Sequence, residues 1–210
     1  LASHYNCPLS CHVAELPEEV RLLKDGGGDI QDLLVERGMF DDLWTPPDMS
    51  PVRYLDSLGV LDSLVAVHLN LVEGDLDLLA SKNVKAVFCP QSTRWFGRGR
   101  YMPVRKFLDR GVVIGLGTDS LASNESLNFL GELRVAEEML ADVSRKELLY
   151  MATRGGAEVL GMDCGAIEAG RPADLIGFNV EEECVDWVDV LFDPERTGAD
   201  FVMAGGKRVF

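Results

Sequence analysis

The chain has 210 residues, of which 47% are hydrophobic and 26% are charged. A chain of this length and composition can bury a sizeable core, which excludes intrinsic disorder as the main account. The formal net charge is -15 at pH 7, and this acidic balance argues against nucleic acids and anionic membranes as partners. No uncharged apolar stretch approaches the roughly 20 residues that span a bilayer.

The five cysteines are odd in number and form no CxxC pair. They stand in or beside apolar runs, at Cys7, Cys11, Cys89, Cys164 and Cys184. This usage predicts reduced and mostly buried thiols rather than a disulfide framework. The first residues, LASHYNCPLSC, lack the basic flank and the apolar run of a secretory signal. We therefore expect a cytoplasmic protein.

Short apolar runs alternate with amphipathic helical segments, which predicts an α/β fold with a parallel sheet and crossover helices. The expected strands are residues 8–14, 63–69, 84–89 and 112–116. The expected helices cover 17–24, the first part of 29–49, the segment that Ser50 caps and Pro51 begins, 74–81, 103–111, 124–140 and 144–161. Residues 91–102 are expected to form a long loop, and the glycine-rich residues 162–210 a small β element.

Polar side chains follow the expected strands at the end where α/β folds place their chemistry. His12 and Glu15 follow the first strand, His68 ends the second, and Asp119 follows the fourth. Each residue has an ordinary alternative, because strand-end histidines are often core residues and acids there often cap or begin helices. Their coincidence at successive strand ends instead favours a mononuclear metal hydrolase.

The residue types suggest a role for each of these side chains. The imidazole of His12 and the carboxylate of Asp119 suit zinc or iron as metal ligands. Asp119 can also accept the proton of the attacking water, and Glu15 can pass a proton to the substrate nitrogen. His68 can polarise the water or the developing tetrahedral centre. The expected cofactor is one divalent metal, with zinc preferred to iron.

Several longer motifs resemble the amidohydrolase superfamily, in its chlorohydrolase and aminohydrolase (cytosine deaminase-like) branch. The motifs are HVAE at 12–15, VH at 67–68, CPQS at 89–92, GTDSLASN at 117–124, GGAEVLG at 155–161 and GAIEAGRPADL at 165–175. The segment between Glu15 and His68 looks most like aminodeoxyfutalosine deaminases. The resemblance implies a metal-dependent deaminase, in which His12 and Asp119 are metal ligands, Asp119 is the base, Glu15 is the proton shuttle and His68 assists.

The resemblance also implies a (β/α)8, TIM-type barrel. The four expected strands correspond to strands five to eight, so the chain is expected to hold the C-terminal half of such a barrel. Residues 1–161 then form a partial metal-dependent hydrolase barrel. Residues 162–210 form the C-terminal β element of a small composite sandwich domain. Deamination is favoured over dechlorination because Glu15 can protonate a nitrogen leaving group.

Two features depart from the family pattern. Thr93 follows Ser92 where the family has Asn in its CPxSN motif, which puts the substrate contact of that Asn in doubt. The family's first strand carries an HxH pair of metal ligands, and the chain has no HxH. We therefore expect a fragment that is inactive by itself. The alternatives are an inactive interaction subunit with this fold and one chain of a split enzyme.

Further expectations concern partners and less certain residues. Open strand edges predict a homo-oligomer or a partner that supplies the missing half barrel. Arg94 and Trp95 are expected to bind a heterocyclic or nucleoside-like substrate, with a structural plug by Trp95 and Phe96 as the alternative. Glu132 is expected to face solvent rather than the site. Three arginines are expected to be surface charges: Arg100, Arg105 and Arg134.

Overall fold

The computed structural model describes residues 2–5, 7–97, 99–180 and 186–210. The chain folds into two compact units, which are treated separately below. Unit 1 comprises Leu1–Ala86 and Gly99–Val112, and unit 2 comprises Val87–Arg98 and Val113–Phe210. Within the described ranges, no helix combines the length and the apolar content needed to cross a bilayer.

Four short strands form one sheet in the order in which they follow along the chain. They are β1 (Ser10–Val13), β2 (Val65–His68), β3 (Lys85–Phe88) and β4 (Ile114–Leu116). The pairing of β1 with β2 is parallel, and its register aligns His12 with Val67 and Val13 with His68. All four strands lie within the predicted runs, so the α/β fold with parallel strand pairing is confirmed.

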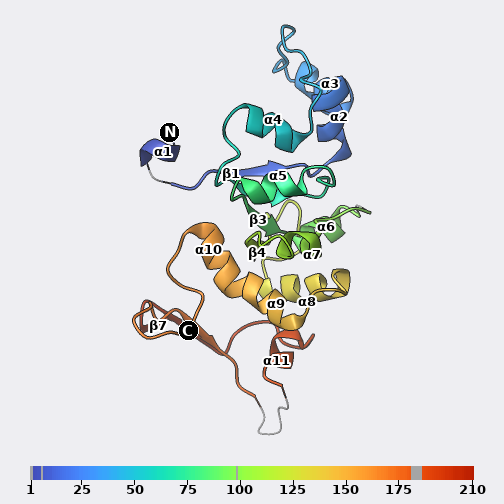
Figure 1. Cartoon of the computed structure of the whole chain (residues 1–210). Helices are drawn as coiled ribbons and strands as arrows, with labels where there is room; N and C mark the ends of the chain where they lie inside the picture. Colours follow the sequence, from blue (N-terminus) through green and yellow to red (C-terminus); the bar gives the residue numbers. More distant parts are fainter. Residues whose placement is uncertain (1, 6, 98, 181–185) are drawn as a thin grey trace. The chain divides into compact units, whose positions relative to one another are not determined.

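Helices follow the strands of unit 1, as the alternation in the sequence predicts (Figure 1). The hydroxyl of Ser50 caps one of them by accepting a hydrogen bond from the backbone N–H of Arg53 at 3.2 Å. Pro51 stands at the first position of this helix and Pro17 at the first position of another, where the missing N–H costs nothing. The helices are α1 (Ala2–Tyr5), α2 (Pro17–Asp25), α3 (Asp29–Glu36), α4 (Pro51–Ser57), α5 (Leu76–Ser81) and α7 (Val104–Leu108).

Unit 2 contains two helices that the sequence analysis did not predict, α6 and α11, and α11 (Asp189–Phe192) lies within the expected β element. Residues 91–102 were expected to form a loop, but α6 covers Pro90–Trp95. Pro90 begins this helix, and the hydroxyl of Thr93 donates to the carbonyl of Cys89 at 2.9 Å, so local polar contacts support the turn. The other helices of unit 2 are α8 (Phe129–Met139), α9 (Arg145–Tyr150), η1 (Met151–Gly155) and α10 (Gly156–Leu160).

The C-terminal part of unit 2 forms the small β element that its glycine-rich pattern predicts. Strands β5 (Leu175–Gly177), β6 (Phe201–Ala204) and β7 (Lys207–Arg208) make a three-stranded sheet. Both pairings are antiparallel, with Ile176 opposite Val202 and Ala204 opposite Lys207.

The cysteines differ from the prediction of mostly buried thiols. The four described cysteines are free, but only Cys89 is buried, whereas Cys7 and Cys11 are exposed and Cys164 is half-buried. Cys7 precedes β1 and Cys11 lies within it. The first three residues of this strand are exposed to solvent, so apolar neighbours in the sequence do not cover these two thiols. Cys184 lies outside the described residues.

Glycines allow the helical segment α9–η1–α10 to pack against β4 in unit 2. A Cβ atom added to Gly155 would lie 2.3 Å from the carbonyl oxygen of Ile114, well inside the contact limit. A Cβ added to Gly115 would lie 3.2 Å from the Cα of Gly156. Helix and strand therefore approach at backbone distance, and the sequence requires glycine at Gly155 because no side chain fits there.

We expect Gly155→Ala to lower the free energy of unfolding by about 1–3 kcal/mol, because overpacking at a backbone contact forces the helix away from the strand. For a protein of 150–250 residues, a loss of about 2 kcal/mol corresponds to a fall of roughly 4–8 °C in melting temperature, and for a longer protein the fall is smaller. The measurement is thermal unfolding, followed by circular dichroism, of the protein expressed from its complete reading frame.

Gly156→Ala is the matched control. A Cβ at Gly156 would lie 3.4 Å from the carbonyl oxygen of Met151, which is an ordinary contact. Alanine also favours helix over glycine by about 1 kcal/mol. Equal melting temperatures for the two variants would contradict the packing that we describe.

Candidate active site

His12 and Glu15 lie at the carboxyl end of β1 in unit 1. His12 is exposed, whereas the next two residues, Val13 and Ala14, are buried. Ala14 adopts a positive φ of 52°, so the chain turns sharply directly after the strand. This turn keeps Glu15 beside the strand end instead of letting it continue along the strand direction.

His68 ends β2 and is 1% exposed. Its ring centroid is 4.9 Å from that of His12, with an angle of 32° between the two planes. Its Nε2 is 3.6 Å from Oε1 of Glu15. The structure thus brings together three of the predicted residues, His12, Glu15 and His68, within unit 1. Their proximity follows from the parallel register, which places Val13 beside His68.

Glu19 holds the turn that carries Glu15, and the sequence analysis did not identify this role. Its two carboxylate oxygens accept hydrogen bonds from the backbone N–H groups of Ala14 at 2.8 Å and Glu15 at 2.9 Å. Burial raises the pKa of the Glu19 carboxyl, against the lowering effect of these bonds. A glutamate at the third position of a helix that starts with Pro17 was the available signal, because such residues reach back to orphan N–H groups.

Asp119 follows β4 in unit 2 and also has a positive φ, of 57°. Its Oδ2 accepts hydrogen bonds from the hydroxyls of Ser92 at 2.8 Å and Ser123 at 2.7 Å. Two donors on one oxygen fix the orientation of the carboxylate. Asp119 does not begin a helix, because the next one, α8, starts at Phe129 and is capped by Asn128. The alternative interpretation of Asp119 as a helix cap is therefore wrong.

Glu132 is fully buried, and the prediction that it faces solvent is wrong. Its Oε2 accepts from the backbone N–H of Gln91 at 2.9 Å, and its Oε1 accepts from the side-chain amides of Gln91 and Asn124, each at 2.8 Å. Burial raises the pKa of the Glu132 carboxyl, and the nearby charge of Asp119 acts in the same direction. Glu132 therefore ties the start of α6 to the loop that follows Asp119.

The two predicted substrate contacts, Arg94 and Trp95, lie on α6 rather than on a loop. They line a small cavity of about 160 Å³ in unit 2, together with Gln91, Asn124, Glu125 and Val135. Arg94 forms an ion pair with Glu138. Trp95 is 52% exposed, so its ring is available for a further contact.

These groups have the chemistry that a hydrolase needs. Imidazole nitrogens and carboxylate oxygens are the protein ligands that zinc and iron accept. A glutamate carboxylate beside a histidine can take up and release a proton. The half-buried carboxylate of Glu19 and the buried carboxylate of Glu132 hold the loops around them and are positioning residues.

Comparison with known proteins gives the same assignment as the motifs. The family model described as "Amidohydrolase family" matches residues 1–209. The chain belongs to this family. The resemblance to the amidohydrolases that the sequence motifs indicated is therefore confirmed.

Among curated amidohydrolase relatives, a 5-methylthioadenosine/S-adenosylhomocysteine deaminase of Pyrococcus furiosus is 35% identical over 188 residues, which are 85% of this chain and 40% of that protein. An aminodeoxyfutalosine deaminase of Deinococcus radiodurans is 35% identical over 163 residues, 73% of this chain and 38% of that protein. The chain thus spans about two-fifths of the length of these relatives.

A solved structure with the same fold is the atrazine chlorohydrolase of Arthrobacter aurescens TC1 complexed with zinc. It superposes with a TM-score of 0.79 at 29% sequence identity. The match covers 99% of this chain and 45% of that chain. The fold of this amidohydrolase chain is therefore found within a larger α/β enzyme.

The buried Glu132 predicts a pH-dependent stability. The pKa of Glu132 is raised in the folded protein, whereas in the unfolded chain it has the ordinary glutamate value of about 4.3. Just above pH 4.3 the folded protein therefore keeps a proton that the unfolded chain has released. The free energy of unfolding therefore falls as pH rises through the window just above 4.3, by at most about 1.4 kcal/mol per pH unit for one proton. Glu132→Gln should remove this part of the slope.

The measurement is urea unfolding of the protein from its complete reading frame at several pH values between about 4 and 7. The slope, rather than the absolute stability, is compared, because an amide at residue 132 also changes the hydrogen bonds. Glu125→Gln, at an exposed residue of the same unit, is the control and should keep the original slope. An unchanged slope in Glu132→Gln would show that the Glu132 proton is not retained.

Proposed function

We propose that this chain supplies the catalytic groups of a metal-dependent hydrolase that deaminates a heterocyclic or nucleoside-like amine. The observation that carries the proposal is the cluster at the ends of β1 and β2, where a buried His68 lies against the ring of His12 and 3.6 Å from Glu15. The family of the chain and the deaminase names of its relatives support it.

In this proposal His12 and Asp119 hold one divalent metal ion. Their imidazole and carboxylate, with the imidazole of His68, form a set of donors that fits such an ion. The zinc in the related chlorohydrolase supports zinc, although the same donors suit iron. A bound zinc or iron ion would lower the pKa of water so that hydroxide forms near neutral pH.

The protein groups then divide the remaining work. Asp119, oriented by Ser92 and Ser123, accepts the proton of the attacking water. Glu15 passes a proton to the departing nitrogen. His68, held by burial, donates a hydrogen bond to the oxygen or water at the reacting carbon. A shuttle for a nitrogen leaving group favours deamination, although one related structure is a chlorohydrolase.

The substrate proposed is a heterocyclic or nucleoside-like amine, as in the names of the relatives. Arg94 and Trp95 are proposed to contact it, because the exposed indole of Trp95 can stack on a flat ring. We also propose that β1–β4 are strands five to eight of a (β/α)8 barrel, with residues 162–210 in a separate small β domain. Coverage of 45% of the chlorohydrolase chain supports this assignment.

The metal ligands are tested in the protein expressed from its complete reading frame. His12→Ala and Asp119→Ala should each lower both bound zinc and ammonia release by more than about 100-fold, since even outer-shell changes cost 10–100-fold. Zinc is measured by mass spectrometry of the protein, and ammonia release is measured with adenosine and 5′-methylthioadenosine.

His4→Ala is the matched control. His4 is the one histidine of the sequence that is not among the candidate site residues, and it is exposed on α1. This variant should leave both zinc content and turnover unchanged. Full zinc content and turnover in His12→Ala would refute the proposed ligand role.

The proton shuttle is tested by Glu15→Gln, which keeps the shape of the side chain and removes its proton transfer. We expect kcat to fall by about 10²–10⁴-fold, with zinc content retained. Glu18→Gln, three residues along the chain and exposed, is the control. A kcat within a factor of two of the original enzyme would exclude Glu15 as the shuttle.

A further inference from the structure

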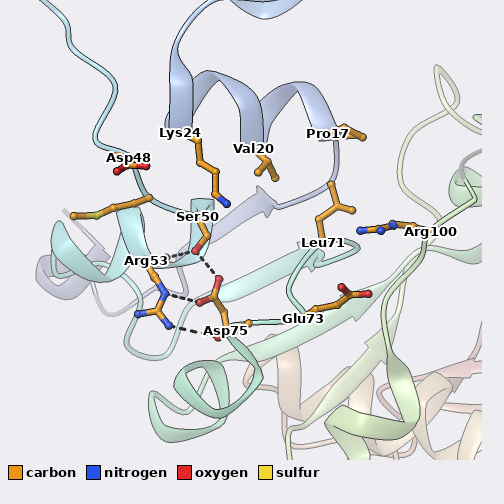
Figure 2. A pocket seen from close by; sticks show the side chains of 12 residues that line it. Pro17, Val20, Lys24, Asp48, Ser50, Arg53, Leu71, Glu73, Asp75 and Arg100 are labelled. Carbon is orange, nitrogen blue, oxygen red and sulfur yellow. Dashed lines mark hydrogen bonds and ion pairs between the residues drawn. The ribbon is translucent and has the colours of Figure 1, made fainter.

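Unit 1 contains a cavity that the proposed reaction does not use. Its volume is about 690 Å³, within the range of about 300–1,000 Å³ typical of small-molecule sites. Residues of α2, of the segment around the start of α4 and of the loop after β2 line it, together with Arg100 (Figure 2). It is large enough for a ligand of the size of an amino acid or larger.

One wall of the cavity is internally satisfied. The buried carboxylate of Asp75 accepts a hydrogen bond from the hydroxyl of Ser50 and pairs with Nε of Arg53 at 2.8 Å. Arg53 also donates to the carbonyl of Gly74 at 3.4 Å. These charges therefore cancel and form a rigid wall, shown by the dashed lines in Figure 2.

Four other charged side chains line the cavity, and none of them has an ion pair or hydrogen bond with any residue that the structure describes. They are the cations Lys24 and Arg100 and the anions Asp48 and Glu73. In Figure 2 the ammonium of Lys24 and the guanidinium of Arg100 both point into the space between them. Two free charges of each sign thus face one cavity.

Apolar side chains fill the rest of the lining. Val20 and Leu71 project into the cavity, and Pro17 and Met49 complete its apolar part. An aliphatic or thioether chain can pack against such a surface. The complete lining therefore suits a ligand that carries a positive and a negative group at one end and a short apolar chain at the other.

We propose that this cavity binds the zwitterionic group of an α-amino acid. Lys24 and Arg100 bind its carboxylate, and Asp48 and Glu73 bind its ammonium group. A simple anion would leave Asp48 and Glu73 as like charges next to it, in a chain whose net charge is already -15. A simple cation would meet the same repulsion from Lys24 and Arg100. A group that carries both charges can pair with side chains of either sign in the lining.

The amino-acid group has two sources, a free amino acid or the tail of a nucleoside substrate. The cavity adjoins the candidate active site along the chain, because Pro17 follows Glu15 by two residues and Leu71 follows His68 by three. S-adenosylhomocysteine, which stands in the name of one relative, carries such a tail, whereas 5′-methylthioadenosine does not. Only this second source rests on the proposed deaminase function.

The test is isothermal titration calorimetry of the protein from its complete reading frame, stripped of metal so that no ligand is consumed, and with its fold checked by circular dichroism. The probes are L-methionine, L-methioninamide and 4-(methylthio)butanoate, of which the last two each lack one charge. We expect L-methionine to bind at least about tenfold more tightly than either analogue, because each loses charge-assisted hydrogen bonds.

Lys24→Met and Arg100→Met should each weaken L-methionine binding by about tenfold, since each removes one cation and keeps the apolar stem. Arg110→Met is the matched control. Arg110 lies in unit 1, pairs with Asp77 at 2.7 Å and does not line the cavity. It should leave the affinity unchanged.

A second arm distinguishes the two sources by titrating S-adenosylhomocysteine and 5′-methylthioadenosine. If the tail occupies the cavity, Lys24→Met and Arg100→Met lower the preference for S-adenosylhomocysteine by about tenfold. If the occupant is a free amino acid, only L-methionine binding falls. Turnover is measured separately with the zinc-loaded protein, in which binding without turnover of either nucleoside would reject the deaminase function and leave this site intact.

The proposal is overturned if neither variant changes the binding of L-methionine or the preference between the two nucleosides. It is also overturned if 4-(methylthio)butanoate binds as tightly as L-methionine, because the cavity would then be a simple anion site.

Discussion

The parallel pairing of β1 with β2 is the interaction on which the candidate site depends. Its register places Val13 beside His68, so the two strands end together and their last side chains meet. Because side chains alternate along a strand, a slip of one residue would turn His12 to the other face of the sheet. The apolar faces of Val13 and Ala66, both buried, specify the register and therefore the chemistry.

Two carboxylates, the half-buried one of Glu19 and the buried one of Glu132, hold the loops that leave the strands. Glu19 accepts two backbone N–H groups of the turn after β1, and Glu132 binds both the start of α6 and the loop after Asp119. Burying an ionised carboxylate costs free energy unless several donors surround it. These two residues meet that condition, and as a result the loops have few alternative conformations.

The sequence predicted the strands well because a buried strand is a run of apolar residues that needs no knowledge of its partners. The candidates His12, Glu15 and His68 could be selected from the sequence because they lie at or just after strand ends, and the structure brings these three side chains together. The sequence analysis missed α6, which is a short helix with an internal hydrogen bond from the hydroxyl of Thr93 to the carbonyl of Cys89 and no clear apolar period.

The burial of Glu132 could not be predicted for a related reason. A glutamate within a helix is usually solvated, and its partners Gln91 and Asn124 lie 41 and 8 residues away in the chain. Only the folded loops bring such donors to a carboxylate. The exposed Cys7 and Cys11 show the same limit, because apolar neighbours in sequence do not guarantee cover in space.

Left-handed backbone conformations mark the ends of the strands. Ala14, His68, Leu69 and Asp119 all have positive φ values, and none of them is glycine. Each such residue costs about 1–3 kcal/mol, which the surrounding contacts must supply. For protein engineering, the consequence is that random libraries at these positions would lose most β-branched members to misfolding before any effect on catalysis could be selected. Asparagine and glycine would survive most often.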